Sequence, residues 1–271
     1  MSDEPIIRLV AFLCVLAALS AWELRAPRRR LQFGRMRRWP SNLGLVLLNG
    51  ALVRLLAPIS AVGLAALLEE RQWGLLALLE LQPWLRLVLA LVLLDLAIYL
   101  QHVLFHAIPA LWRLHRMHHA DLDFDLTTGL RFHPIEILLS FALKLFVVAA
   151  LGPPVLAVLL FEVILNATSM FNHANGRLPD RLDAAFRWLV VTPDMHRLHH
   201  SVQPAETNSN FGFNLPWWDR LLGTYRAEPV GGHAGMTVGL SQFREPSELG
   251  LWRLLTQPFR APPTGYPLGQ R

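Results

Sequence analysis

The chain has 271 residues, of which 53% are hydrophobic and only 17% are charged. This composition is richer in apolar residues than an ordinary soluble domain, so it predicts an integral membrane protein and excludes an ordinary soluble one. The formal net charge of +5 suits anionic headgroups or an acidic partner at the membrane surface; nucleic acid is not expected as a partner because no binding module is recognisable.

The first part of the chain contains three apolar runs, at about 5–24, 41–68 and 83–106. Asp3 and Glu4 precede the first run and seven arginines follow it between positions 25 and 38, which is the reverse of a secretory signal. We therefore expect a retained membrane helix with its N-terminus outside. The arginine-rich segment is then cytoplasmic, and the third run brings the chain back to the cytoplasmic side.

Two further apolar runs, 135–151 and 155–172, flank the breaker Gly152-Pro153-Pro154 and predict a helical hairpin whose ends both face the cytoplasm. Lys144 and Glu162 lie nine residues before and after Pro153, so we predict a buried ion pair between them. The alternative is that tilted helices let each charge reach a wet interface separately. Glu162 lies too far along its helix from the exit of the hairpin to be a metal ligand.

The remainder of the chain is expected to lie on the cytoplasmic side. It begins with Gly176 as a left-handed helix stop and an amphipathic helix near 180–190. A short helix should follow, capped by Thr192 and with Pro193 at its first position. Trp217 and Trp218 are expected to sit at headgroup level. The residues from about 260 should be loose because they are rich in proline and glycine.

Ten of the eleven histidines form a pattern that folding alone does not require. His102 and His106 share one helical face, and the pentad HRMHH at 115–119 is repeated almost unchanged as HRLHH at 196–200. These motifs hold His115, His118, His119, His196, His199 and His200. His133 and His173 stand at the entry and exit of the hairpin, whereas the remaining His233 is expected to be solvated.

Neutral imidazoles bind Zn, Fe, Cu and Ni, and ten of them exceed what one metal ion needs. Two ions, each with four or five nitrogens and an open position, would use eight to ten. A pair of oxygen-bridged irons can activate dioxygen against an unactivated C–H bond. Two alternatives remain open: a histidine-rich membrane metal transporter, whose ligands would follow a path through the membrane, and a zinc-dependent membrane hydrolase, which would need a motif such as HExxH.

The motifs HVLFH, HRMHH and HRLHH, together with RFHPIE, FNHANG, TPDMHRLHH and NFGFNLPWWDRLLGTY, resemble those of the fatty acid hydroxylase and sterol desaturase superfamily. The resemblance covers about 85–226. It implies a domain organisation of N-terminal transmembrane helices at 1–80, a di-iron oxygenase core at 81–226 and a C-terminal tail at 227–271. The expected fold is all-α: an integral membrane bundle of about four to five membrane helices, including the hairpin, with a cytoplasmic helical cap that carries a histidine cluster.

The resemblance also implies that the eight motif histidines ligate two irons, and that His173 and His133 complete the ligand set. The implied reaction uses dioxygen and two electrons to hydroxylate or desaturate a lipid, either a sterol or a fatty-acyl type. Ligand imidazoles usually donate their second N–H to a neighbour. We expect those neighbours to include Asp95 and Tyr99, on the His102 face, and Asn172 and Asp194, which adjoin other ligands.

The sequence shows no cysteine cluster, cytochrome b5 module or dinucleotide fingerprint that would supply electrons. An external donor, ferredoxin-like or another reduced carrier, is therefore expected to dock on the arginine-rich cytoplasmic face. The lipid itself, the choice between hydroxylation and desaturation and the oligomeric state do not follow from the residues.

Overall fold

The structure is a computed structural model that describes residues 4–262 and 265–268. Within this part of the chain the regular elements are all helices, and β-pairing is limited to two isolated bridges. The all-α prediction is confirmed.

Five helical segments are long and apolar enough to span a membrane, as expected for a multi-pass membrane protein. They are α1 (Glu4–Arg25), α2 (Arg35–Leu56) with α3 (Ala61–Glu70), α4 (Pro83–Ala107), α6 (Pro134–Leu151) and α7 (Val155–Asn172). The span expected at 41–68 falls within Arg35–Glu70, but its helix is interrupted between Leu56 and Ala61, which was not expected. The interruption contains Pro58, and Ser60 caps the start of α3 by accepting a hydrogen bond from the Gly63 N–H.

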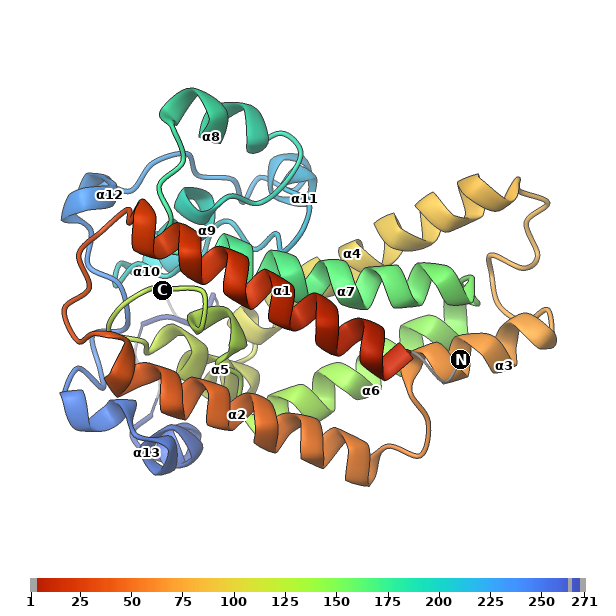
Figure 1. The fold of residues 1–271 in the computed structure, drawn as a ribbon, viewed down its shortest axis with the longest axis horizontal. Coiled ribbons are helices and arrows are strands. Elements are labelled where there is room, and N and C mark those ends of the chain that lie inside the picture. Colours follow the sequence, from red (N-terminus) through yellow and green to blue (C-terminus); the bar gives the residue numbers. More distant parts are fainter. Residues whose placement is uncertain (1–3, 263–264, 269–271) are drawn as a thin grey trace.

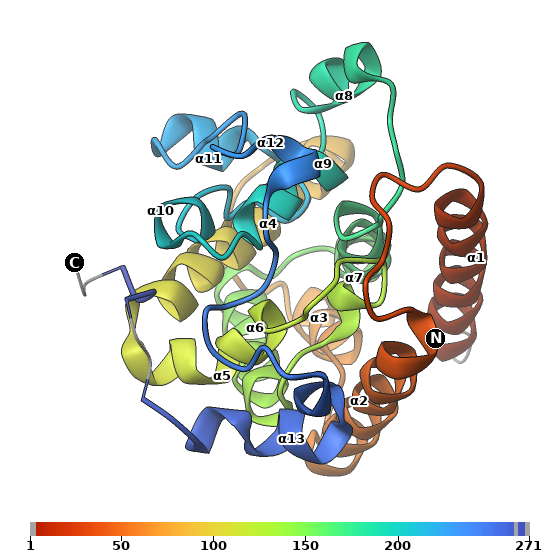
Figure 2. The same ribbon diagram turned by 90° about the vertical axis from the view of Figure 1, so that its left-hand side faces the viewer.

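The long helices run side by side, and the short helices gather at one end of them (Figure 1). We call these short helices, their connecting segments and the loop between α1 and α2 at the same end, residues 26–34, 108–133 and 173–262, the cap. The view from that end shows the cap spread across the ends of the long helices (Figure 2). The cap contains α5 (Pro109–His119), η1 (Thr128–Leu130), α8 (Asp180–Phe186), α9 (Pro193–His199), α10 (Pro204–Thr207), α11 (Trp217–Leu221), α12 (Gly232–Gly235), η2 (Pro246–Leu249), α13 (Leu251–Thr256) and η3 (Gln257–Phe259).

Local sequence explains where the key helices start and stop. Proline occupies the first turn of α4, α5, α6 and α9, where its missing N–H costs nothing. The Thr192 hydroxyl caps α9 as predicted, by accepting from the Met195 N–H. At the hairpin, Gly152 adopts a left-handed conformation with φ 57°, which ends α6 before the Pro153-Pro154 turn. Helix α7 packs against α1, α3 and α4, so it forms the centre of the bundle.

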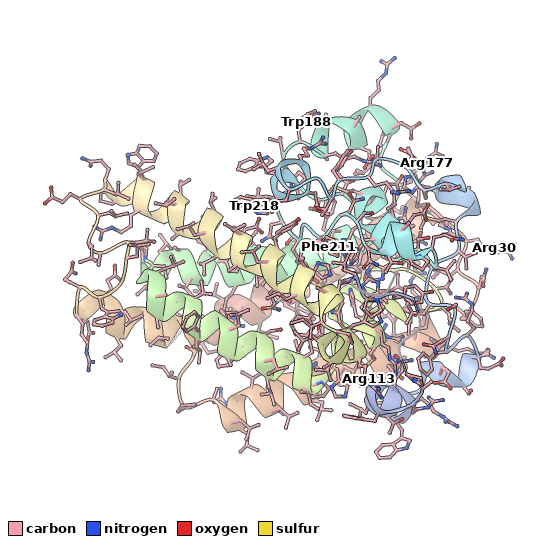
Figure 3. All side chains as sticks on the ribbon, turned by 180° about the vertical axis from the view of Figure 1, so that it is seen from behind. Arg30, Arg113, Arg177, Trp188, Phe211 and Trp218 are labelled. Atoms are coloured by element: carbon pink, nitrogen blue, oxygen red, sulfur yellow. The ribbon has the colours of Figure 1, made fainter. Side chains whose placement is uncertain are left out.

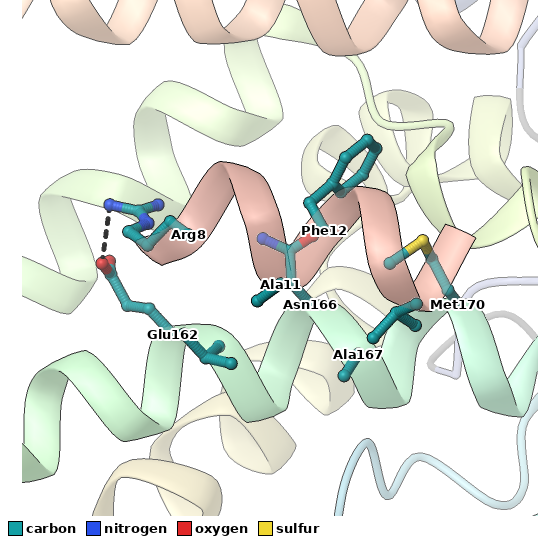
Figure 4. A pocket seen from close by; sticks show the side chains of 9 residues that line it. Arg8, Ala11, Phe12, Glu162, Asn166, Ala167 and Met170 are labelled. Carbon is teal, nitrogen blue, oxygen red and sulfur yellow. Dashed lines mark ion pairs between the residues drawn. The ribbon is translucent and has the colours of Figure 1, made fainter. Parts of the chain in front are cut away.

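The predicted ion pair within the hairpin is confirmed. Lys144 Nζ lies 2.7 Å from Glu162 Oε1, and Glu162 is only 4% exposed. Arg8 of α1 joins them, with its guanidinium 2.9 Å from the other Glu162 oxygen (Figure 4). Because one carboxylate here faces two cations, the alternative of two separately solvated charges does not hold.

Three smaller expectations were wrong. Gly176 is not left-handed; it is needed because a Cβ there would lie 2.4 Å from the Trp22 ring. The C-terminal segment is not loose at Tyr266, which is 2% exposed and stacks on Trp112. His233 is not solvated, since it is 7% exposed and its Nε2 lies 3.2 Å from a carboxylate oxygen of Glu228.

Candidate metal centre

Nine of the ten predicted histidines converge at the junction of the long helices and the cap, and all nine are buried. They form two groups, and within each group the candidate ligand atoms lie within 4.8 Å of one another. The first group holds His102, His106, His115, His119 and His199, and the second holds His118, His173, His196 and His200.

Helix geometry explains how the motifs are divided between the groups. His102 and His106 are four residues apart on α4, so they share a face and a group. Successive residues on a helix point about 100° apart. His118 and His119 therefore face different groups, and His199 and His200 at the end of α9 do the same. Each HxxHH motif thus serves both groups.

Ring nitrogens approach one another closely within each group. In the second group His118, His196 and His200 each place Nε2 3.1 Å from His173 Nε2. In the first group the same separation joins His102 to His115 and His199, and His106 to His119. Two nitrogens about 2.1 Å from one metal ion and at right angles would be roughly 3.0 Å apart, so these separations fit ligands of a shared ion.

The hydrogen bonds of the opposite ring nitrogens leave the facing nitrogens free to bind a cation. His102 and His199 direct Nδ1 at the backbone carbonyls of Phe211 and Ser209, at 2.8 and 2.7 Å. A carbonyl only accepts, so Nδ1 carries the proton of each neutral ring and Nε2 is a bare lone pair. His173 is fixed in the same way by the Ser169 carbonyl. Lone pairs that face lone pairs repel unless a metal ion lies between them.

Burial also keeps the cap imidazoles neutral. Desolvation lowers the pKa of His173 and of His199 to about 3, and neighbouring imidazoles act in the same direction. The pKa values of His118, His119, His196 and His200 are lowered for the same reasons. Near neutral pH these side chains are therefore in the form that binds metal.

The side chains that orient the ligands include two that the sequence interpretation missed. Glu136 accepts a hydrogen bond from His115 Nδ1 at 2.6 Å, and Asn208 Oδ1 lies 3.1 Å from His106 Nδ1. Glu136 is 3% exposed in the first turn of α6. A carboxylate two residues after Pro134, within RFHPIE, was a signal that could have identified it.

The four predicted partners of the ligands make other contacts. Asp95 accepts from the side chains of Asn214 and Trp218, and Tyr99 bonds Thr224. These two side chains thus hold the segment after α10 against α4 rather than touching an imidazole. The expectation of direct hydrogen bonds to ligands was wrong for both.

Asn172 donates to the Phe213 carbonyl, and Asp194 pairs with Arg28 at 2.9 Å and with Arg197. Neither side chain hydrogen-bonds a ligand imidazole, so these two expectations were wrong as well. Both residues still support ligand-bearing segments, because Asn172 ends α7 and Asp194 lies in the first turn of α9.

His133 lies outside both groups. Its Nδ1 caps α6 by accepting from the Ile135 N–H, and its Nε2 lies 3.1 Å from the Leu255 carbonyl. Because both ring nitrogens are engaged away from the centre, the expectation of a tenth ligand is corrected.

Phenyl rings pack against the histidines of both groups. Phe132 stacks on His118 with ring centroids 4.5 Å apart, and also contacts His115 of the other group. Phe213 lies 6.2 Å from His102 and 6.1 Å from His196, so it also faces both groups. Phe211, labelled in Figure 3, lies inside the molecule against the first group. The two groups are therefore buried among aromatic side chains, and this low-dielectric environment strengthens electrostatic interactions within them.

The fold and this double histidine site agree with the family comparison. The model of the fatty acid hydroxylase family matches residues 87–224, which is 138 of the 271 residues and includes all nine converging histidines. The chain belongs to the fatty acid hydroxylase family. The resemblance identified from the histidine motifs is thereby confirmed.

Several curated proteins are similar to the chain. An ornithine lipid hydroxylase of Rhizobium tropici is 35% identical over 53% of this chain and 43% of its own length. An alkylglycerol monooxygenase of Xenopus tropicalis is 27% identical over 74% of this chain and 45% of its own length. A cholesterol 25-hydroxylase of Rattus norvegicus is 32% identical over 52% of this chain and 47% of its own length. The chain thus spans less than half the length of each of these relatives. No solved structure matches it.

Proposed function

We propose that the protein is a membrane-bound oxygenase that holds two iron ions and hydroxylates or desaturates a C–H bond of a lipid. The main support for this proposal is the pair of histidine groups, with five and four members, at one end of a bundle of candidate membrane helices. The names of the similar proteins, all hydroxylases or monooxygenases of lipids, support it.

For hydroxylation the overall reaction consumes the lipid R–H, one O₂, two electrons and two protons, and yields R–OH and water. When bound, the iron pair would supply the activation of dioxygen. The protein's own share is to orient the ligand imidazoles through Glu136, Asn208 and backbone carbonyls, and to exclude water with the surrounding phenyl rings. The substrate class we propose is an apolar lipid delivered from the surrounding bilayer.

We propose that the two electrons come from a separate reduced carrier, and that the cap lies on the cytoplasmic side with the N-terminus outside. The support for this orientation is the arginine-rich segment 25–38, which joins α1 to α2 at the cap end. A metal transporter fits the site less well, because the histidines gather at one end of the bundle and do not line a path through the membrane. A hydrolase fits less well because no carboxylate belongs to either group.

The test is expression in a lipid-rich host followed by untargeted lipid mass spectrometry, with His118→Ala as the inactive comparison. We expect a lipid in the wild-type host that has gained one oxygen or lost two hydrogens, and that is missing with the variant. Identical lipid profiles in the two hosts, at equal protein levels and with iron bound in the wild type, would contradict the proposal.

A further inference from the structure

A pocket of about 230 Å³ opens in the cap, between the loop after α1, the segment after α5 and helix α12. We call it the arginine pocket after three of its lining residues, Arg29, Arg30 and Arg244. Asp123 and Phe124 form part of its wall. None of these residues belongs to the histidine site itself.

The charge of the arginine pocket is not balanced by the protein. The Arg29 guanidinium donates one N–H to the Met236 carbonyl, but its NH1 is buried without an acceptor. Arg244 donates only to backbone carbonyls. Among the described residues no ion pair joins Arg29, Arg30 or Arg244 to a carboxylate. Arg29 and Arg244 are half-buried, and a guanidinium group withdrawn from water in this way is normally compensated by a carboxylate, whereas Arg30 is exposed.

The one carboxylate in the wall is already engaged. Both Asp123 oxygens accept from backbone, one from the Gln32 N–H at 3.0 Å and the other from the Phe33 N–H at 2.8 Å. Three arginines and one acidic side chain therefore line the pocket, and that acidic side chain, Asp123, already accepts hydrogen bonds from the loop after α1. It is suited to carboxylate groups supplied by a partner.

Phe124 connects this pocket to the metal centre. Its ring stacks on His173 with centroids 5.4 Å apart and lies 5.2 Å from the ring of His200. Both histidines belong to the second group. A single phenyl ring thus stands between the arginine pocket and two metal-ligand imidazoles, so a partner bound here would be close to the centre.

The position of the pocket favours a soluble partner over a lipid. Most of its lining residues lie in the loop after α1, in the segment after α5 and in and around α12. The pocket therefore lies at the cap end of the molecule, opposite the turn between α6 and α7. Arg30 is exposed and projects outward from this end (Figure 3). A protein that approaches from the aqueous side would meet Arg30 first.

We propose that the arginine pocket is the docking site of an acidic protein that carries one electron at a time, with Phe124 as the side chain between that carrier and the second histidine group. This inference rests on the proposed function. Each reduced carrier would lose one electron to the metal centre and leave oxidised by one electron. Two successive dockings would supply the two electrons that one oxygenation consumes.

The test measures binding of a reduced acidic [2Fe–2S] ferredoxin to the full chain in nanodiscs of neutral lipid. Arg30→Glu reverses a charge at the mouth of the pocket. Gly235→Glu adds a carboxylate to its wall, where a Cβ meets no atom within 4 Å. Arg253→Glu is the matched control, because Arg253 is an exposed arginine of α13 away from the pocket. Reduction of the iron-loaded protein is also followed anaerobically, with ferredoxin and with dithionite.

We expect ferredoxin binding that weakens with salt, that falls about tenfold in Arg30→Glu and in Gly235→Glu, and that is unchanged in Arg253→Glu. Reduction by ferredoxin should slow in the two pocket variants, whereas reduction by dithionite should not. Absent binding to the wild type, or an equal loss in all three variants, would overturn the proposal. So would variants that lose binding to anionic lipid vesicles but not to ferredoxin. Iron content and dithionite reduction test the metal centre separately, so failure there would count against the proposed function instead.

Discussion

Glu136 accepts a hydrogen bond from His115 Nδ1 at 2.6 Å, and both side chains are almost fully buried. A carboxylate in this position fixes the ring so that Nε2 faces the other ligands, and it raises the basicity of the imidazole. We predict that Glu136→Gln lowers the iron affinity of the first group by about 10- to 100-fold. Titration of the metal-free protein with ferrous iron measures this effect.

Glu245→Gln is the control for that prediction, because Glu245 is exposed and remote from the centre. The control should bind iron as the wild type does. Equal affinities for wild type and Glu136→Gln would show that this carboxylate does not support the ligand.

Gly129 lies directly against the second group, because a Cβ there would be 2.3 Å from the Ser169 carbonyl oxygen and 2.9 Å from His173 Nδ1. Gly129→Ala should displace His173, lower the free energy of unfolding by about 1–3 kcal/mol and reduce iron binding. Gly50→Ala is the matched control, since nothing lies within 4 Å of its added methyl group. That helical substitution should be neutral or stabilising by up to about 1 kcal/mol. Similar melting temperatures for the two variants would contradict the close packing around Gly129.

Glu162 pairs with two cations in the bundle, Lys144 and Arg8. Glu162→Gln leaves Lys144 without a partner carboxylate and leaves Arg8 with only Glu4, 3.3 Å away, whereas Lys144→Met leaves Glu162 paired with Arg8. We predict that Glu162→Gln costs on the order of 3 kcal/mol and that Lys144→Met costs clearly less. Thermal unfolding in detergent micelles tests the order. A larger loss of stability in Lys144→Met than in Glu162→Gln would contradict this prediction.

Asp121 makes stability depend on pH in the acid range. Burial by itself raises its pKa, but Arg38 and Arg131 outweigh burial and lower the pKa to about 2. Since the pKa of the folded state is below the unfolded value of about 3.9, the stabilisation is fully present above pH 4 and is lost as the pH falls toward 2. The difference in melting temperature between wild type and Asp121→Asn should be large at pH 6 and shrink below pH 4. A difference that stays constant over this range would contradict the assignment.

The convergence of nine histidines could be predicted because the chemistry of metal binding demands repeated histidines at helical spacing. The hairpin ion pair could be predicted because Lys144 and Glu162 are equidistant from the turn. The break between α2 and α3 was missed, since an apolar run with one proline reads as a single span. His133 was misassigned because its position in the sequence fits a ligand equally well as a helix cap.

The partners of the ligands could not be derived from the sequence because they depend on how the cap folds back. Asn208 and the carbonyl of Phe211 reach α4 from more than 100 residues away. The arginines after α1 were read as one charged surface, but Arg38 is buried and pairs with Asp121 and Asp125 at 2.6 Å. Only the tertiary structure separates such structural arginines from those that line the arginine pocket.

We propose that the two distinct histidine groups each hold one iron ion. Metal analysis of the purified protein, in the wild type and in His118→Ala, tests it most directly, because His118 belongs only to the second group. We predict about two iron ions per wild-type chain and a loss of about one in the variant, with the first group still loaded. One zinc ion per wild-type chain, or two irons retained without His118, would show that the two groups do not each hold an iron ion.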